Sequence, residues 1–153
     1  MSKSNKKNKN FVPLDASLER KAKTRDERSV AESLPLILFS FKDFQFNQQI
    51  PPGQSYRQWQ ENEMLAYMLE KFGSTCNLNI VEAIQQKLLK IYGNFPNNSE
   101  FRNPFPDEKL EWGVIMKISG QKGRVAGHLM NNVFYIVFLD EEHKFYPTEK
   151  RNT

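Results

Sequence analysis

The sequence has very few of the residues from which disulfides, zinc sites and membrane spans are built. It contains one cysteine, Cys76, and two histidines, so an internal disulfide is impossible and a structural zinc site is disfavoured. Its longest apolar run, Pro35 to Ser40, is far shorter than the roughly 20 residues that span a bilayer. With no recognisable signal peptide, these absences predict a cytoplasmic chain without a membrane contact and without a metal or other cofactor.

The sequence also lacks glycine-rich phosphate loops and the common nucleophile motifs. Its seven glycines form no P-loop, no dinucleotide-binding fingerprint and no hydrolase elbow. Cys76 is predicted to lie between two helices, and the sequence identifies no histidine partner for its thiol. Nucleotide-binding enzymes and thiol hydrolases are therefore disfavoured.

Positive charge is concentrated at the start of the chain. Residues 1–33 hold nine Lys or Arg and five Asp or Glu, and 9 − 5 gives +4, the net charge of the whole chain. Residues 34–153 hold 13 of each sign and are formally neutral. We predict a disordered basic N-terminal tail over 1–33 and a folded domain over 34–153. The tail is either a solvated leader or an arm that becomes ordered on RNA or another partner.

What the sequence does contain is large apolar side chains, because it has 12 Phe, 5 Tyr and 2 Trp. This composition is typical of a compact core, and Trp59 and Trp112 are expected in that core rather than as platforms for base stacking. The Leu-, Ile- and Phe-rich stretch 34–46 predicts a first strand. Pro51-Pro52-Gly53 prevents a strand from continuing beyond it.

Two helices are predicted next, each beginning with a capping box. Ser55 and Gln58 begin the first helix, and Asn79 and Glu82 begin the second. The apolar stripes expected to face the core are Leu65, Met68, Leu69 and Phe72 on the first helix and Ile80, Ile84, Leu88 and Ile91 on the second. Gly73 and Gly93 are expected to end the helices, which then form an antiparallel hairpin.

Three further strands, 112–119, 124–130 and 133–139, are predicted after a long polar loop at 94–109. Turns at 119–123 and at Asn131-Asn132 separate them, since asparagine tolerates positive φ. The last strand is apolar on both faces and is therefore expected at the centre of the sheet. The predicted fold class is α+β, with an antiparallel sheet, a two-helix hairpin and the order β-α-α-β-β-β.

The candidate functional residues lie on and around the last two strands. Arg124 and His128 are predicted to face the same way, about 13 Å apart at roughly 3.3 Å per residue. The other candidates are Lys117 before the hairpin turn, Lys122 in the turn, and His143, Lys144 and Tyr146 after the last strand. A curled sheet would bring these groups together on one concave surface.

These side chains suit RNA. Arg and Lys hold phosphates, and Tyr stacks on bases. Cleavage through the 2′-hydroxyl requires a base for its proton, a cation for the charged phosphorane and an acid for the leaving 5′-oxygen. Histidine fits the acid or base role because it titrates near neutrality.

Each candidate also has a structural interpretation. A single strand arginine such as Arg124 is typically a surface or ion-pairing residue. His128 is compatible with a structural role. His143 follows three acidic residues and pairs with them in the simplest interpretation.

The segment Glu111 to Pro147, EWGVIMKISGQKGRVAGHLMNNVFYIVFLDEEHKFYP, resembles the RelE/ParE family of bacterial toxins. An arginine-bearing strand (KGRVAGHL) pairs with an apolar strand (NVFYIVFLD), and a short polar tail follows. As a pattern of elements, the resemblance extends over residues 34–147. It implies a concave, basic sheet surface. Many members of that family cut messenger RNA in the ribosomal A site, others bind gyrase, and a cognate antitoxin neutralises them by wrapping around the toxin.

The resemblance also implies residue roles. Arg124 resembles the strand arginine that contacts the scissile phosphate. His143 and Tyr146 resemble the acid/base and stacking groups near the family's C-terminus, and Lys117 and Lys122 resemble its phosphate-holding lysines. The predicted catalytic set is Arg124, His143 and Tyr146, and the predicted RNA-binding set is Lys117, Lys122, His128 and Lys144.

Two functional hypotheses follow. The first is an endoribonuclease toxin that acts on messenger RNA, on the ribosome, and that has a cognate antitoxin as partner. The second is a non-catalytic RNA- or protein-binding module on the same scaffold. A catalyst needs Arg124, His143 and Tyr146 within reach of one phosphate, whereas a binding module would leave them scattered and present an apolar groove.

Overall fold

The computed structural model describes residues 34–51 and 54–147. The chain divides into two units, Met1–Pro35 and Leu36–Thr153, and all the described helices and strands lie in the second. The predicted basic tail, residues 1–33, lies outside the described residues.

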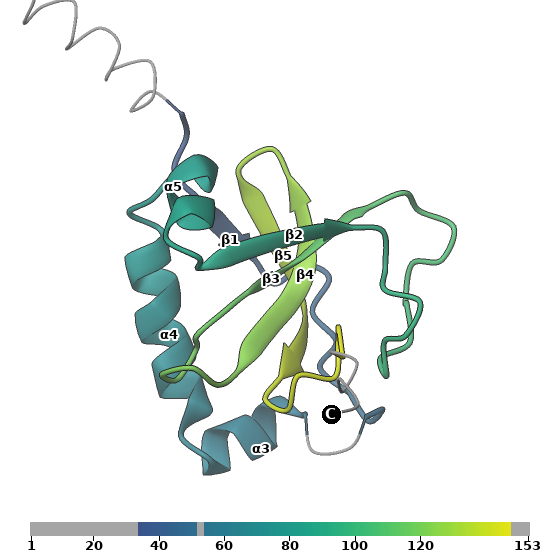
Figure 1. The fold of residues 1–153 in the computed structure, drawn as a ribbon. Helices are drawn as coiled ribbons and strands as arrows, with labels where there is room; N and C mark the ends of the chain where they lie inside the picture. The colour runs from purple at the N-terminus through teal and green to yellow at the C-terminus, as the bar shows by residue number, and fades with distance from the viewer. Residues whose placement is uncertain (1–33, 52–53, 148–153) are drawn as a thin grey trace, which may run out of the picture. The chain divides into compact units, whose positions relative to one another are not determined.

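The described unit is α+β, with three helices on one side of a five-stranded mixed sheet (Figure 1). The elements are β1 (Leu38–Ser40), α3 (Tyr56–Glu61), α4 (Met64–Thr75), α5 (Ile80–Gln85), β2 (Leu89–Gly93), β3 (Glu111–Ile115), β4 (Arg124–Met130) and β5 (Val133–Asp140). The strand order is β1-β5-β4-β3-β2, with β1 parallel to β5 and every other pair antiparallel. The predicted α+β class is confirmed, whereas the prediction of an entirely antiparallel sheet is wrong.

Both predicted capping boxes are confirmed. The Ser55 side chain accepts the backbone N–H of Gln58, and the Asn79 side chain accepts that of Glu82. In each case the side chain of the third helical residue also accepts the backbone N–H of the cap. The first predicted helix is divided, because Glu63 adopts a left-handed conformation between α3 and α4.

The second predicted helix is wrong beyond its first turns. Helix α5 ends at Gln85, Lys87 has a φ of 59°, and the chain then enters β2. Strand β2 pairs with β3, with Leu89 opposite Ile115. The order is therefore β-α-α-α-β-β-β-β, and Leu89 and Ile91 belong to an edge strand rather than to a helix hairpin.

The predicted first strand is also much too long. Only Leu38–Ser40 pairs with β5 as a strand, because a turn at Phe41–Phe44 interrupts the ladder. In this turn the Phe44 N–H donates to the Phe41 carbonyl. Beyond this turn the segment follows the outer edge of β5 through three irregular contacts. The Gln45 backbone N–H donates to the Val137 carbonyl. The Gln48 side chain donates to the Leu139 carbonyl and accepts the Leu139 backbone N–H. The Gln54 side chain accepts the backbone N–H of Glu141.

The β4–β5 hairpin agrees with prediction. Asn131 has a φ of 54° in the turn, and β5 lies inside the sheet, between β1 and β4. One core lies between the helices and the sheet and includes Trp59, Phe72 and Phe134. A second core lies on the opposite face, where Phe101 from the long loop after β2 packs with Trp112 and other buried residues. This loop therefore closes the second core.

A β-bulge determines which β5 side chains face this second core. Ile136 pairs with Gly127 and Phe138 pairs with Ala126, so Val137 is an extra residue. An extra residue reverses the faces of the side chains that follow it. Ile136 accordingly packs in the first core and Phe138 in the second. Asp140, two residues further along, is opposite Arg124.

In the described part of the chain, no helix combines the length and the apolar character that crossing a bilayer requires.

Candidate functional site

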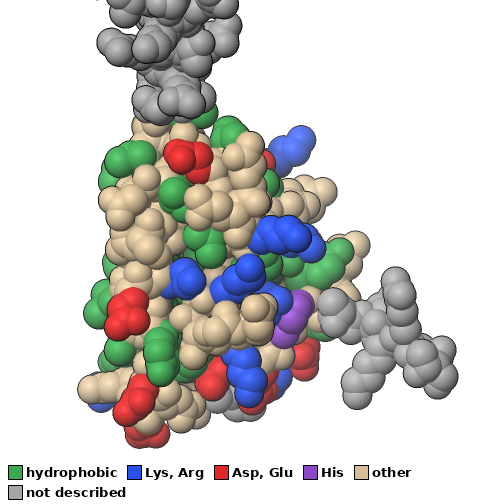
Figure 2. Space-filling view, turned by 60° about the vertical axis from the view of Figure 1, so that its left-hand side comes forward, with side chains coloured by type: hydrophobic (Ala, Val, Ile, Leu, Met, Phe, Trp, Pro, Cys, Tyr) green, Lys and Arg blue, Asp and Glu red, His purple; other side chains and the backbone are tan. Residues whose placement is uncertain are grey.

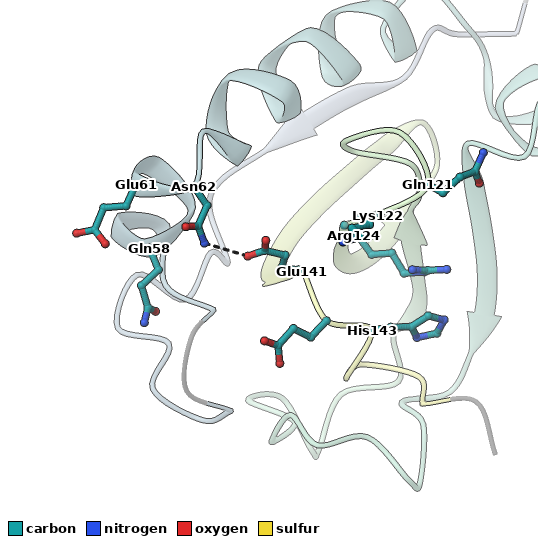
Figure 3. A pocket seen from close by; sticks show the side chains of 10 residues that line it. Gln58, Glu61, Asn62, Gln121, Lys122, Arg124, Glu141 and His143 are labelled. Atoms are coloured by element: carbon teal, nitrogen blue, oxygen red, sulfur yellow. Dashed lines mark hydrogen bonds between the residues drawn. The ribbon is translucent and has the colours of Figure 1, made fainter. Parts of the chain in front are cut away.

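A cavity of about 710 Å³ lies where β4 begins and the loop after β5 passes helix α3. Figure 2 shows Lys and Arg side chains gathered on one face beside a histidine side chain. The cavity is lined by Lys122, Arg124 and His143 together with Glu61, Glu141 and Glu142, by the polar residues Gln58, Asn62 and Gln121, and by Gly123. Figure 3 shows the α3 residues across the cavity from the basic ones. The cavity thus has a basic side and an acidic side.

The basic side is built from a tight turn and a strand end. Ser119 and Lys122 exchange two backbone hydrogen bonds of 2.9 Å, and Gly123 has a φ of 78°. This closure fixes Lys122 in the turn and starts β4 at Arg124. The acidic side is attached to α3, since Asn62 donates to the Glu141 carboxylate over 3.3 Å.

His143 occupies an unusual backbone conformation in the loop after β5. Its φ is 63°, in the region that favours glycine. The Asp140 carboxylate supports this loop by accepting the backbone N–H groups of Lys144 and Phe145, each over 2.8 Å. Asp140 is fully buried. Burial raises the pKa of its carboxyl, while these hydrogen bonds and the charges of His143 and Arg124 oppose the rise.

Two buried nitrogen atoms at the cavity have no hydrogen-bond partner within the protein. They are Nε of Arg124 and Nδ1 of His143. Leaving a buried polar atom unpaired costs about 1–3 kcal/mol. Gln54 Nε2, Trp59 Nε1 and His128 Nδ1 are also buried without a partner, so what distinguishes the two atoms at the cavity is their common location. The two belong to residues that line one cavity.

Tyr146 contacts Tyr92, a residue that the sequence did not mark as a candidate. Its ring stacks on that of Tyr92, with centroids 4.3 Å apart and planes 2° from parallel, and Tyr146 remains 40% exposed. Burial raises the pKa of Tyr92, and the nearby charge of Arg124 opposes that rise. The Tyr pair is therefore within electrostatic reach of Arg124. The helix predicted for this segment gives no reason to single out Tyr92, which lies on β2 in the structure.

Lys144 is engaged in an ion pair. Its Nζ lies 2.8 Å from a Glu142 carboxylate oxygen, and this hydrogen bond raises the pKa of the Lys144 amine. Lys144 is absent from the cavity lining, although Glu142 belongs to it.

Lys117 and His128 lie away from the cavity. Lys117, with a φ of 58°, lines a separate cavity of about 330 Å³ together with Tyr67 and Lys71. His128 is 4% exposed, its Nε2 lies 2.8 Å from the Asp43 carboxylate, and its ring stacks on Tyr135. The structural interpretation of His128 is supported by these contacts, and Trp59 and Trp112 are buried as expected.

Metal coordination finds no support in the described residues, because no three His, Cys, Asp or Glu side chains within 34–51 and 54–147 are grouped to hold an ion. No family model, curated protein or solved structure matches this chain. The resemblance to RelE/ParE toxins therefore remains a prediction.

Proposed function

We propose that this protein is a RelE-like endoribonuclease toxin that cleaves messenger RNA on the ribosome and is neutralised by a cognate antitoxin in the cytoplasm. One observation supports the nuclease activity above all. Arg124 and His143 line one cavity, and each presents a buried nitrogen without a protein partner. A phosphodiester supplies acceptor oxygens for such groups and a negative charge for Lys122 and Arg124.

The proposed reaction is transesterification. The 2′-oxygen attacks the adjacent phosphorus, its proton passes to a base, and the bond from phosphorus to the 5′-oxygen breaks as that oxygen is protonated. The products are a 2′,3′-cyclic phosphate and a 5′-hydroxyl. Arg124 stabilises the phosphorane charge, Lys122 holds a phosphate oxygen, and His143 performs one proton transfer. The carboxylates on the acidic side of the cavity are candidates for the other transfer.

The Tyr92–Tyr146 pair is suited to orient the substrate. The stacked arrangement holds the Tyr146 ring in place while leaving it 40% exposed. Stacking of one base on an aromatic side chain contributes about 1–3 kcal/mol and does not depend on base identity. A nucleotide next to the scissile phosphate would stack there while its phosphate contacts Arg124.

The first prediction tests this site. Arg124→Ala should lower RNA cleavage by about 10²–10³-fold, because it removes a charge placed for the transition state. His143→Gln should also lower cleavage and abolish the pH dependence that His143 gives to the rate. The measurement is cleavage of translated messages together with toxicity on expression, since a ribosome-dependent enzyme is silent on naked RNA.

Arg102→Ala is the matched control, because Arg102 is an exposed arginine outside the cavity lining. Its cleavage rate should equal that of wild type. Full activity of folded Arg124→Ala and His143→Gln would show that the site is misplaced.

The acidic side of the cavity favours the second candidate, a non-catalytic binding module. Glu61, Glu141 and Glu142 oppose a polyanion, and a protein partner carrying both charges would match the two sides better than RNA. Wild-type protein that is neither toxic nor nucleolytic, but binds a protein through Arg124 and Glu61, would establish this alternative.

A further inference from the structure

A buried carboxylate beneath the cavity is not assigned a part in the reaction above. Asp140 is 0% exposed, and its two oxygens accept the N–H groups of Lys144 and Phe145. These residues follow His143 directly, so the two hydrogen bonds fix the backbone that carries the imidazole. His143 retains its φ of 63° within this hydrogen-bonded turn.

Asp140 is also the β5 residue paired with Arg124. The two residues are directly opposite across β4 and β5. This pairing depends on the Val137 bulge, because a regular β5 would direct Asp140 toward the helices instead. The charges of His143 and Arg124 both act to lower the pKa of the Asp140 carboxyl, against the effect of its burial.

The start of the same loop is held by a residue from another segment. The backbone N–H of Glu141 donates to the Gln54 side chain over 2.7 Å, and Gln54 is fully buried. The loop is thus restrained on both sides of His143, at Glu141 before it and at Lys144 and Phe145 after it.

We propose that Asp140 is a positioning residue that holds His143 at the cavity beside Arg124 by fixing the backbone at residues 143–145. This inference rests on the proposed function for its consequence in catalysis. The carboxylate does not touch substrate. It keeps His143 at its place in the cavity.

Other charged side chains line the same cavity as His143. They are Lys122 and Arg124 from the hairpin and β4, Glu61 from α3, and Glu141 and Glu142 from the loop itself. These groups are unchanged in a variant of Asp140 alone. A difference between such a variant and wild type therefore reports the contribution of Asp140.

The first experiment compares Asp140→Asn with wild type. The variant keeps the shape of the side chain but loses its charge, and its amide nitrogen cannot accept an N–H. RNA affinity should be unchanged, since Lys122 and Arg124 remain, while kcat should fall by about 10–100-fold because His143 is displaced. Asp43→Asn, which alters the partner of His128 outside the cavity, should keep both kcat and RNA affinity.

The second experiment needs no RNA and separates this inference from the proposed function. In NMR spectra recorded without RNA, the backbone amide and ring signals of His143 should move in Asp140→Asn relative to wild type, while the ring signals of His128 stay in place. Unchanged His143 signals, or an unchanged kcat in active enzyme, overturn the proposal. If wild type does not cleave RNA, the proposed function fails and the NMR comparison still decides the role of Asp140.

If Asp140→Asn does not fold, wild type alone provides the test. The amide proton shifts of Lys144 and Phe145 should follow the titration of the Asp140 carboxyl, and the ring signals of His143 should change over the same pH interval. His143 ring signals that stay constant while Asp140 titrates would overturn the positioning role.

Discussion

At the scale of single residues, the cavity contains one of the five described non-glycine residues that have a positive φ. A non-glycine residue in the left-handed region costs about 1–3 kcal/mol, and His143 is in that region. The N–H groups that follow His143 bind Asp140, and this contact is part of what offsets the cost. Strain of this kind at a residue with an unpaired buried nitrogen is typical of functional sites.

Asp140 gives a prediction for the pH dependence of stability. Burial raises the pKa of its carboxyl above the usual 3.8, so the folded state binds this proton more tightly than the unfolded state does. The resulting contribution to stability is fully present below about pH 3.8 and is lost as the pH rises through the raised value.

Asp140→Asn does not titrate and lacks this contribution. As the pH falls from about 7 toward about 4, the free energy of unfolding of wild type should therefore increase relative to that of Asp140→Asn. Urea denaturation of both proteins over this range measures the difference. A difference that is constant, or that moves in favour of the variant on acidification, would contradict the assignment.

At the scale of elements, the apolar stripe of α4 differs from the one that periodicity predicted. Met64, Met68 and Phe72 are buried, whereas Leu69 is 66% exposed. Ile84 on α5 is 44% exposed as well. Residues at positions i, i+4 and i+8 face the sheet here, and the wider predicted stripe included a neighbour that faces away from it.

A stability prediction follows for α4. Phe72→Ala should lower the free energy of unfolding by about 3–5 kcal/mol, because the ring is 6% exposed and stacks on Phe39 at 4.0 Å. Leu69→Ala is the matched control and should change it by less than about 0.5 kcal/mol. Chemical denaturation of the two variants checks this. Equal losses would place Leu69 in the core and contradict the orientation of the helix.

The second predicted helix is a shorter helix followed by a strand, and this difference has a physical explanation. Leu88 and Ile91 have the spacing of a helical stripe, whereas Leu89 and Ile91 have the spacing of one face of a strand. The choice depends on β3, which offers Ile115 opposite Leu89 and so a ladder of hydrogen bonds for this segment. The partner lies more than 20 residues away, where local patterns carry no information about it.

At the scale of the whole molecule, charge is distributed unevenly along the chain. Residues 34–153 are formally neutral, while residues 1–33 carry the net +4. Nonspecific RNA affinity depends on salt through the number of phosphates that a protein neutralises. Deletion of residues 1–33 should therefore weaken nonspecific RNA binding and flatten its dependence on salt concentration.

Fluorescence titrations with single-stranded RNA at several salt concentrations measure this effect. Cleavage by the shortened protein should still require Arg124, because that residue belongs to the described unit. A shortened protein with an unchanged salt dependence would show that the folded unit supplies the phosphate contacts.

The sequence by itself determined the features that depend on near neighbours. The capping boxes at Ser55 and Asn79 need a partner only three residues away. The Asn131 turn and the two strands beside it depend on a few adjacent residues. The joint placement of Arg124 and His143 was anticipated as well, because both lie at the same end of this hairpin.

Only the tertiary structure decided the rest, because the partners lie far apart along the chain. Strand β1 is short since its continuation turns away and Asp43 contacts His128, 85 residues distant. Tyr92 joins Tyr146 only once β2 has paired with β3. Asp140 lies opposite Arg124 only because of the bulge at Val137. Hydrogen-bond registry across a sheet is a property of two segments together, and neither segment specifies it alone.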